Sequence, residues 1–455
     1  MARNALLRGG RWLLAALLAL VLLIASLTGM TWWWAGREDA LQWTLERAER
    51  AAGGRLTISS AHGSLRDEVR IDRLAWRDAS LALEARDLRL RIDWLQSFRL
   101  AVGLSYLTAA EIDVALPPDD GSPPKVPAAF PLPLPAQVGE ARVGVLRIDR
   151  AAARDELRDL RFAYAGGPFS HEIHGLATDF LARGISGHAR LDGEIGASAP
   201  FVTHAQASLQ TSAPYAADIE AKLRGTLEHP RIEASVEAFG VTSQLQASLA
   251  PFAPKRLTAL KANAGRIDAA MLAASLGVSA AGSVPHTTLG VQLEGEERDP
   301  GHFAGHINVV NTSPGPVDRN LLPMVRLASA FSTDLSSLVL DRLDIALGGG
   351  QLSGTARLDP HRASLDLRAA GINLRTLYST LRETSLAGPL TMELEGARQV
   401  ARGELQQEGF SLAFDASKAG ERLDLRSFRA QAQGGEASGS GTVWLRRTEI
   451  GRAHV

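Results

Sequence analysis

Residues 79–94 read ASLALEARDLRLRIDW, and this stretch decides the fold because apolar and polar side chains alternate along it. Its large apolar positions are Leu81, Leu83, Leu88, Leu90 and Ile92. The same alternation returns at Ile112, Val114 and Leu116. A period of two puts one kind of side chain on each face of a β-strand, and antiparallel sheets commonly have one apolar face and one wet face. The sequence therefore predicts antiparallel strands.

Short alternating runs separated by glycine continue from residue 143 to the end, for example at Leu343, Ile345 and Leu347. Residues 340–358 can be laid over residues 425–443, and residues 265–277 over residues 371–383. Each stretch of the second pair joins a short predicted helix to strands. Two matched pairs indicate repetition of one unit, with chance similarity among Gly- and Leu-rich strands as the alternative.

A long sheet with one apolar face must hide that face in a barrel, against a second layer, or in a trough that accepts an apolar guest. Membrane barrels need strands of about ten residues with aromatic girdles, which the chain lacks. A packed sandwich stays open as an alternative. The third alternative, the trough, corresponds to a curled, taco-like β-groove that binds acyl chains. The candidate groove residues are Leu81, Leu83, Leu88, Leu90, Ile92, Ile112, Val114, Leu116, Leu343, Ile345 and Leu347.

An apolar run, WLLAALLALVLLIASLTGM, occupies residues 12–30. About 20 such residues span a bilayer as a helix. Three arginines precede the run and Glu38 and Asp39 follow it, so the positive-inside rule predicts a cytoplasmic N-terminus and an exported remainder. A cleaved signal peptide is the alternative. The predicted anchor residues, including an interfacial tryptophan belt, are Trp12, Leu13, Leu14, Leu17, Leu18, Leu20, Val21, Leu22, Leu23, Ile24, Trp32, Trp33 and Trp34.

The chain divides into five predicted parts. They are the cytoplasmic tip and anchor (1–37), a helix with the first β-segment (38–116), a Pro-rich connector (117–135), a repeating β-region (136–449) and a short tail (450–455). The connector has too many prolines for a sheet interior, because proline lacks a ladder donor. A proline-rich ligand for a recognition domain is its alternative function.

Composition and motifs give little support for catalysis, metal binding or nucleic-acid binding. The net charge of -1 argues against nucleic acid, and the absence of cysteine excludes thiol catalysis and Cys-ligated zinc. His171 and His174 lack the spacing of a zinc helix motif, and in a strand they would lie on opposite faces. Residues 348–350 (GGG) fit a strand turn or bulge better than a phosphate loop. We therefore expect a protein that is not an enzyme, with no metal site and no cofactor.

Residues 54–148 are the most distinctive block. It contains GRLTISSAHGSLRDEVRIDRLAWRDASLALEARDLRLRIDWLQ, then YLTAAEIDVALPP, the Pro-rich break and FPLPLPAQVGEARVGVLRI. Together with the single anchor, this block resembles the N-terminal part of the TamB family (translocation and assembly module, inner-membrane subunit), within the wider AsmA-like family of proteobacterial envelope proteins. The resemblance implies an inner-membrane protein whose β-groove crosses the periplasm and moves phospholipid toward the outer membrane. It also implies outer-membrane protein assembly with a TamA-type barrel.

Members of that family are usually longer, and the C-terminal domain that would meet the barrel is missing from this sequence. Residues 450–455 (IGRAHV) resemble a translated sequencing adapter joined to a truncated gene. Two alternatives remain: a scaffold for outer-membrane protein assembly that conducts no lipid, and another AsmA-like paralogue with a different cargo.

Overall fold

The computed structural model describes residue 26 and residues 29–78, 81–97, 101–116, 125–150, 153–182, 184–212, 216–271, 285–396 and 398–444. The chain is mainly β, with a few short helices, as predicted. Residues 29–35 are helical. The bounded helices are α2 (Glu38–Ala51), α3 (Trp94–Ser97), the 3-10 helix η1 (Val317–Arg319) and α5 (Leu374–Leu377).

Two compact units make up the chain, and this division near residue 215 is not among the predicted boundaries. Unit 1 comprises Met1–Ser122 and Val126–Tyr215, and unit 2 comprises Pro123–Lys125 and Ala216–Val455. The strands of unit 1 are β1 (Leu56–Gly63), β2 (Val69–Arg77), β3 (Ala82–Ile92), β4 (Val102–Ala115), β5 (Ala136–Arg150), β6 (Ala153–Gly166), β7 (Ser170–Ala182), β8 (Ile185–Gly196) and β9 (Val202–Thr211).

The strands of unit 2 are 9 to 12 residues long, so the prediction that the chain lacks strands of about ten residues was wrong. They are β10 (Ala217–Thr226), β11 (Pro230–Ala238), β12 (Val241–Leu249), β13 (Leu257–Asp268), β14 (Thr288–Asp299), β15 (His302–Asn311), β16 (Met324–Thr333), β17 (Leu338–Leu347), β18 (Gly350–Asp359), β19 (Arg362–Ile372), β20 (Leu386–Glu395), β21 (Arg398–Gln407), β22 (Phe410–Ala419), β23 (Arg422–Ala432) and β24 (Gly435–Trp444).

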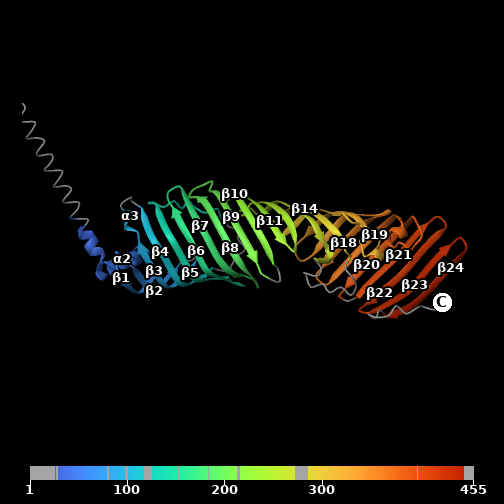
Figure 1. The fold of residues 1–455 in the computed structure, drawn as a ribbon, viewed down its shortest axis with the longest axis horizontal. Coiled ribbons are helices and arrows are strands. Elements are labelled where there is room, and N and C mark those ends of the chain that lie inside the picture. Colours follow the sequence, from blue (N-terminus) through green and yellow to red (C-terminus); the bar gives the residue numbers. More distant parts are fainter. Residues whose placement is uncertain are drawn as a thin grey trace, which may run out of the picture. The chain divides into compact units, whose positions relative to one another are not determined.

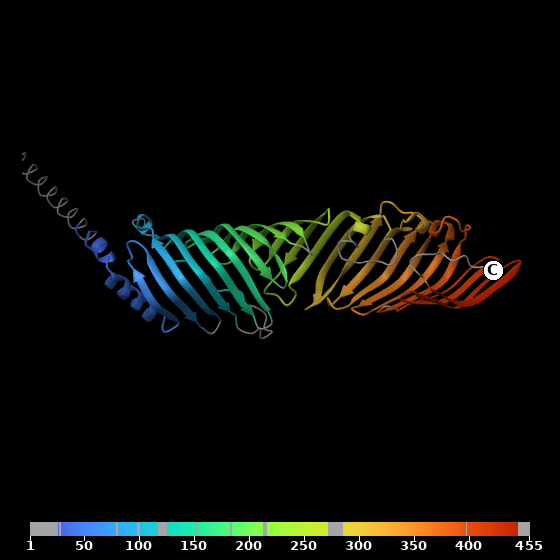
Figure 2. The same ribbon diagram turned by 60° about the horizontal axis from the view of Figure 1, so that its bottom comes forward.

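Within each unit, every strand pairs with its neighbour in chain order, and the strands lie side by side in that order (Figures 1 and 2). These pairs are antiparallel except β4–β5, which is parallel. The antiparallel prediction did not include this exception. Its physical cause is the connector: Val102 of β4 donates its N–H to Pro135 O at 2.7 Å, so the chain returns to the starting end of β4 before β5 begins.

The alternation of β3 is interrupted at Asp87, which has φ +47°. The register of β2 with β3 is the same on both sides of Asp87, from Leu74↔Ala85 to Ile71↔Leu88, so no residue is inserted there. Ala85 and Leu88 are nevertheless both buried in one cluster, although three positions separate them.

One predicted repeat has the same structure in both copies. Residues 340–358 and residues 425–443 each form a hairpin. Its second strand begins at Gly350 in the first copy and at Gly435 in the second, and these two glycines are aligned. The bulge of β17 places Leu343 opposite Gly354, and the bulge of β23 places Phe428 opposite Gly439. Identical registers support repetition of one hairpin unit.

The N-terminal helix α2 matches its prediction and packs on the first strands. Two residues past its end come Gly53 and Gly54, both with positive φ. Leu41 of α2 is fully buried in a cluster formed with β1–β4. The carboxylate of Glu49 accepts the N–H of Ile58 at 2.6 Å, and Gln42 Nε2 donates to Ala61 O at 3.0 Å. The helix therefore covers the apolar face of these strands and satisfies polar groups of β1.

Candidate functional site

The candidate site is the apolar face of unit 2, which we define by cross-strand rows of directly paired residues. One row takes a single position from each of the strands β10–β24. Its members are Leu223, Ile232, Ala247, Leu260, Gly295, Gly305, Phe331, Leu340, Ala356, Leu365, Met392, Ala401, Ala416, Leu425 and Gly441. Every member is apolar or glycine, so the row has no charged side chain along its length.

A second row lies on the same face and consists of Ile219, Val236, Ser243, Ala264, Val291, Val309, Leu327, Ile345, Leu352 and Ala369. Ser243 is the one polar member of this second row. The positions between the two rows are also apolar over β10–β15, namely Ala221, Ala234, Leu245, Ala262, Leu293 and Ile307. Because directly paired residues lie on the same face of a sheet, the two rows form a continuous apolar stripe that runs across the strands.

The opposite face is polar in the same strands. Its central row begins Lys222, Glu233, Gln246, Lys261, Glu294 and His306. Lys261 Nζ lies 3.0 Å from a Glu294 carboxylate oxygen, and both side chains are well exposed. The division between a wet face and an apolar face is therefore as sharp as the sequence pattern predicts.

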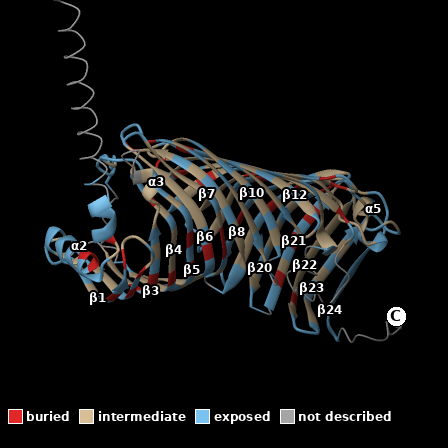
Figure 3. Cartoon of the chain, turned by 60° about the vertical axis from the view of Figure 1, so that its left-hand side comes forward, coloured by how far each residue is buried: buried red, intermediate tan, exposed pale blue. Residues whose placement is uncertain are grey.

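The apolar stripe is only half-buried over β10–β13. In these four strands the alternating residues are exposed on the polar face and intermediate on the apolar face, and only Pro230, at the start of β11, is buried. Figure 3 shows the same pattern, with intermediate positions along the strands and few buried ones. A packed second layer would bury these side chains, so no described part of the chain seals the stripe here.

Other parts of the apolar faces are covered. In unit 2, Leu374 and Leu377 of α5 pack on a cluster around Leu386 and Leu405. Leu343 is buried, with Leu340 and Ile345 packed against its cluster, and Leu347 packs on the cluster beside α5. The predicted groove residues Leu343, Ile345 and Leu347 therefore lie on the apolar face but in its better-packed portion.

The predicted groove residues that lie within β3 and β4 of unit 1 also share one face. Leu83 lies opposite Val114, Leu90 opposite Leu107, and Ile92 opposite Leu104. Leu88 is buried, and Leu83, Leu90 and Ile112 pack against the same cluster beneath α2. Leu81 precedes β3, and Leu116 follows β4 and is exposed. The sequence pattern identified the face, but it contained no signal that α2 covers this end.

The polar face of unit 1 carries an ion-pair network. Arg86 contacts Glu84 and Glu111 at 3.1 Å each, and Arg147 contacts Glu111 and Asp113 at 3.4 Å each. The hydrogen bond from Arg147, together with its charge, holds the pKa of Glu111 below its ordinary value. These groups are partly open to solvent, so they make a hydrated surface.

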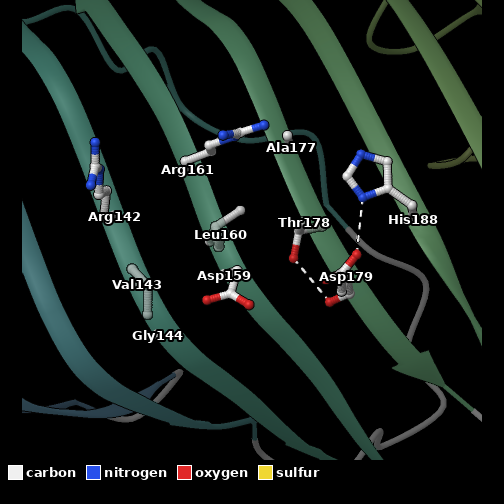
Figure 4. A pocket seen from close by; sticks show the side chains of 10 residues that line it. All are labelled: Arg142, Val143, Gly144, Asp159, Leu160, Arg161, Ala177, Thr178, Asp179 and His188. Atoms are coloured by element: carbon white, nitrogen blue, oxygen red, sulfur yellow. Dashed lines mark hydrogen bonds and ion pairs between the residues drawn. The ribbon is translucent and has the colours of Figure 1, made fainter.

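A hollow of about 540 Å³ lies over β5–β8 of unit 1 (Figure 4). Arg142, Arg161, Asp159 and Asp179 give its lining charges of both signs. His188 Nδ1 lies 3.0 Å from the Asp179 carboxylate. Asp159 has φ +50°, and the register of β6 with β7 shifts between Arg158 and Arg161, so the hollow lies beside a β-bulge. Its mixed charges do not suit an acyl chain.

His171 and His174 lie on opposite faces of β7, as predicted. His171 contacts the Tyr164 hydroxyl at 2.7 Å and the Phe130 carbonyl at 2.9 Å, while His174 lies 3.0 Å from the Glu172 carboxylate. Each imidazole thus has a structural partner. Within the described ranges, no group of three or more His, Asp or Glu side chains is arranged to hold a metal ion. Residues 348 and 349 form the turn between β17 and β18, as the glycines predict.

The predicted anchor residues Trp12 to Ile24 and the tail 450–455 lie outside the described residues, as do residues 117–124 of the connector. Trp32, Trp33 and Trp34 are helical and exposed. Of the helices that are described, none has the length and apolarity needed to span a bilayer. Comparisons of the chain with protein-family models, curated proteins and solved structures found no match.

Proposed function

We propose that this chain is a membrane-anchored lipid carrier that conducts phospholipids along the apolar stripe of its sheet. The observation that carries the proposal is the fifteen-position row from Leu223 to Gly441, which is apolar or glycine at each strand and is left half-buried over β10–β13. An uncovered apolar surface of this extent is typical of an interaction site.

Acyl chains fit this surface chemically. Each methylene group that leaves water contributes about 0.8 kcal/mol. Because neighbouring strands present nearly the same apolar lining, a bound chain changes its free energy little as it moves from one strand to the next. The sheet spacing of about 4.8 Å makes these steps short. The stripe therefore supports movement as well as binding, while the polar face stays in water.

The cellular setting follows from the resemblance to the TamB and AsmA-like families. In this proposal the apolar run of residues 12–30 anchors the chain in the bacterial inner membrane, and the sheet lies in the periplasm as a curled groove open to lipid. Lipid moves toward the outer membrane, and a TamA-type barrel is the partner in outer-membrane protein assembly.

A scaffold that conducts no lipid is the second candidate. The covered portions favour it, because Leu41 of α2 and Leu377 of α5 seal parts of the apolar faces with side chains of the protein itself. The two candidates differ at β10–β13, where a lipid carrier needs an accessible surface and a scaffold needs a protein partner.

Mass spectrometry of the gently purified full chain separates them. The lipid carrier predicts co-purifying phospholipid that is lost on Leu260→Asp substitution in β13, while the variant still accumulates. Phospholipid-free protein, or variants that retain the wild-type amount of lipid, would contradict the proposal.

A further inference from the structure

The turn between β3 and β4 carries the short helix α3, which is held firmly to the sheet of unit 1. Asp93 donates its N–H to Gly103 O at 2.8 Å, and Ala101 donates to Gln96 O at 3.2 Å. Trp94 Nε1 donates to Leu65 O at 3.2 Å. These bonds fix the direction in which α3 presents its remaining side chains.

The helical residues 29–35 are attached to the same place. The rings of Trp32 and Trp94 meet edge to face with centroids 5.7 Å apart. The Arg66 guanidinium lies 5.9 Å from the centre of the Trp32 ring. The backbone N–H of Arg66 donates to the carbonyl oxygen of Ala35 at 3.2 Å. Ala35 is 1% exposed. Two segments about sixty positions apart in the sequence thus form one cluster.

Large apolar side chains of this cluster face solvent. Leu95 is 76% exposed, Met30 69% and Trp33 61%. Exposing such side chains together is unfavourable in water, and a contiguous apolar patch marks a surface that meets a partner or a membrane. Tryptophan beside arginine is the composition that anchors proteins at the level of lipid headgroups.

The position of the patch in the chain selects the bilayer as its occupant. The apolar run of residues 12–30 ends two residues before Trp32, so an anchor formed by this run places Trp32 and Trp33 at the membrane interface. Leu95 follows Trp94 in α3, and the Trp94 ring contacts that of Trp32. Leu95 therefore lies close to the tryptophans that the anchor places at the membrane interface.

We propose that Leu95 of α3 inserts into the interfacial layer of the anchoring bilayer and docks the β3–β4 turn of unit 1 on the lipid surface. The inference rests on the membrane anchor of the proposed function. It adds a second, folded contact with the membrane, which would hold the first strands of the sheet against the lipid source.

Site-specific labelling tests this docking, because the natural chain has no cysteine. Leu95→Cys, Trp33→Cys and Phe169→Cys variants of the full chain would each carry an environment-sensitive fluorophore in vesicles of phosphatidylethanolamine and phosphatidylglycerol. Nitroxide groups on the lipids, placed near the headgroup, quench fluorophores that reach the interface. Phe169, at the β6–β7 turn of the same unit, is 85% exposed and serves as the matched control.

We expect strong quenching at positions 95 and 33 and little at position 169. Quenching at 33 without quenching at 95 would overturn the docking and leave the anchor intact. A label at 95 that is shielded from water but not quenched by the lipid nitroxides would indicate a protein partner, which also overturns the docking. No quenching at either position would refute the anchor and the docking together. Equal quenching at all three would overturn the specific role of α3.

Discussion

Leu245 lies directly opposite Ala262 in the antiparallel ladder of β12 and β13, with both side chains on the apolar face. The next residue, Gln246, lies opposite Lys261 on the polar face. Neither Leu245 nor Ala262 is buried, although both are apolar. This pair shows the central feature of the protein: a sheet with two chemically distinct faces, of which the apolar one is open over β10–β13.

The bulge at Arg342 in β17 yields a prediction about stability. Arg342 has φ +53°, a backbone conformation that β-branched residues adopt only with strain. Arg342→Val should reduce the free energy of unfolding by about 1–2 kcal/mol, and Arg342→Gly should leave it nearly unchanged. Chemical denaturation measures the difference. Arg357→Val, in the regular part of β18, is the control. Equal stability of the Val and Gly variants would show that the positive φ carries no cost.

Glu297 yields a prediction about pH dependence. Its carboxylate accepts the N–H groups of Gly301 at 2.8 Å and Leu257 at 3.0 Å, and also that of Arg256. These bonds, that from Gly301 foremost, hold the pKa of Glu297 below its ordinary value. A lowered pKa in the folded state gives stability that is present above the unfolded pKa of about 4.3 and is lost as pH falls through the folded pKa.

Glu297→Gln should therefore cost on the order of 2 kcal/mol at neutral pH, because charge-assisted hydrogen bonds become neutral ones. The difference from the natural chain should shrink in acid. Thermal unfolding at several pH values checks both points. Glu294→Gln, an exposed position of the same strand, should have little effect. A cost for Glu297→Gln that stays constant into acid would contradict the proposed role of the charge.

The Pro-rich connector packs on unit 1 through Phe130. Its ring stacks on that of Phe201 with centroids 5.5 Å apart, and its N–H donates to Ala197 O at 2.9 Å. Phe130→Ala should loosen this segment, since one partner of the stack is removed. Limited proteolysis should then cleave the connector several-fold faster than in the natural chain. Leu134→Ala, at an exposed position of the same segment, should change the rate little. Unchanged cleavage of Phe130→Ala would show that the stack does not hold the connector.

Much of the fold followed from the alternation of side chains. The strands around Leu83 and Ile112, the turn at Gly349 and the helix at the start of segment 38–116 lie where the sequence predicts them. The burial of both Ala85 and Leu88 does not follow from alternation, which places positions 85 and 88 on opposite faces; the positive φ of Asp87 between them interrupts the pattern.

The rest depends on contacts between distant segments, which periodicity does not record. The parallel pairing of β4 with β5 requires the connector to return along the strand. The cover over the first strands requires α2 to fold back so that Leu41 meets the apolar face. The contact of Trp32 with Trp94 joins a predicted interfacial residue to one with no functional signal in the sequence.

Phospholipid capture by variants at two neighbouring positions is the most direct test of the open apolar face. Leu245→Asp places a carboxylate on the apolar stripe, and Gln246→Asp places the same group on the polar face one residue away. An unpaired charge against an acyl chain costs several kcal/mol, so bound phospholipid per purified protein should fall at least about tenfold in Leu245→Asp. It should stay near the natural level in Gln246→Asp. Equal lipid content in two folded variants would contradict the account, because it would mean that the apolar face does not hold the lipid.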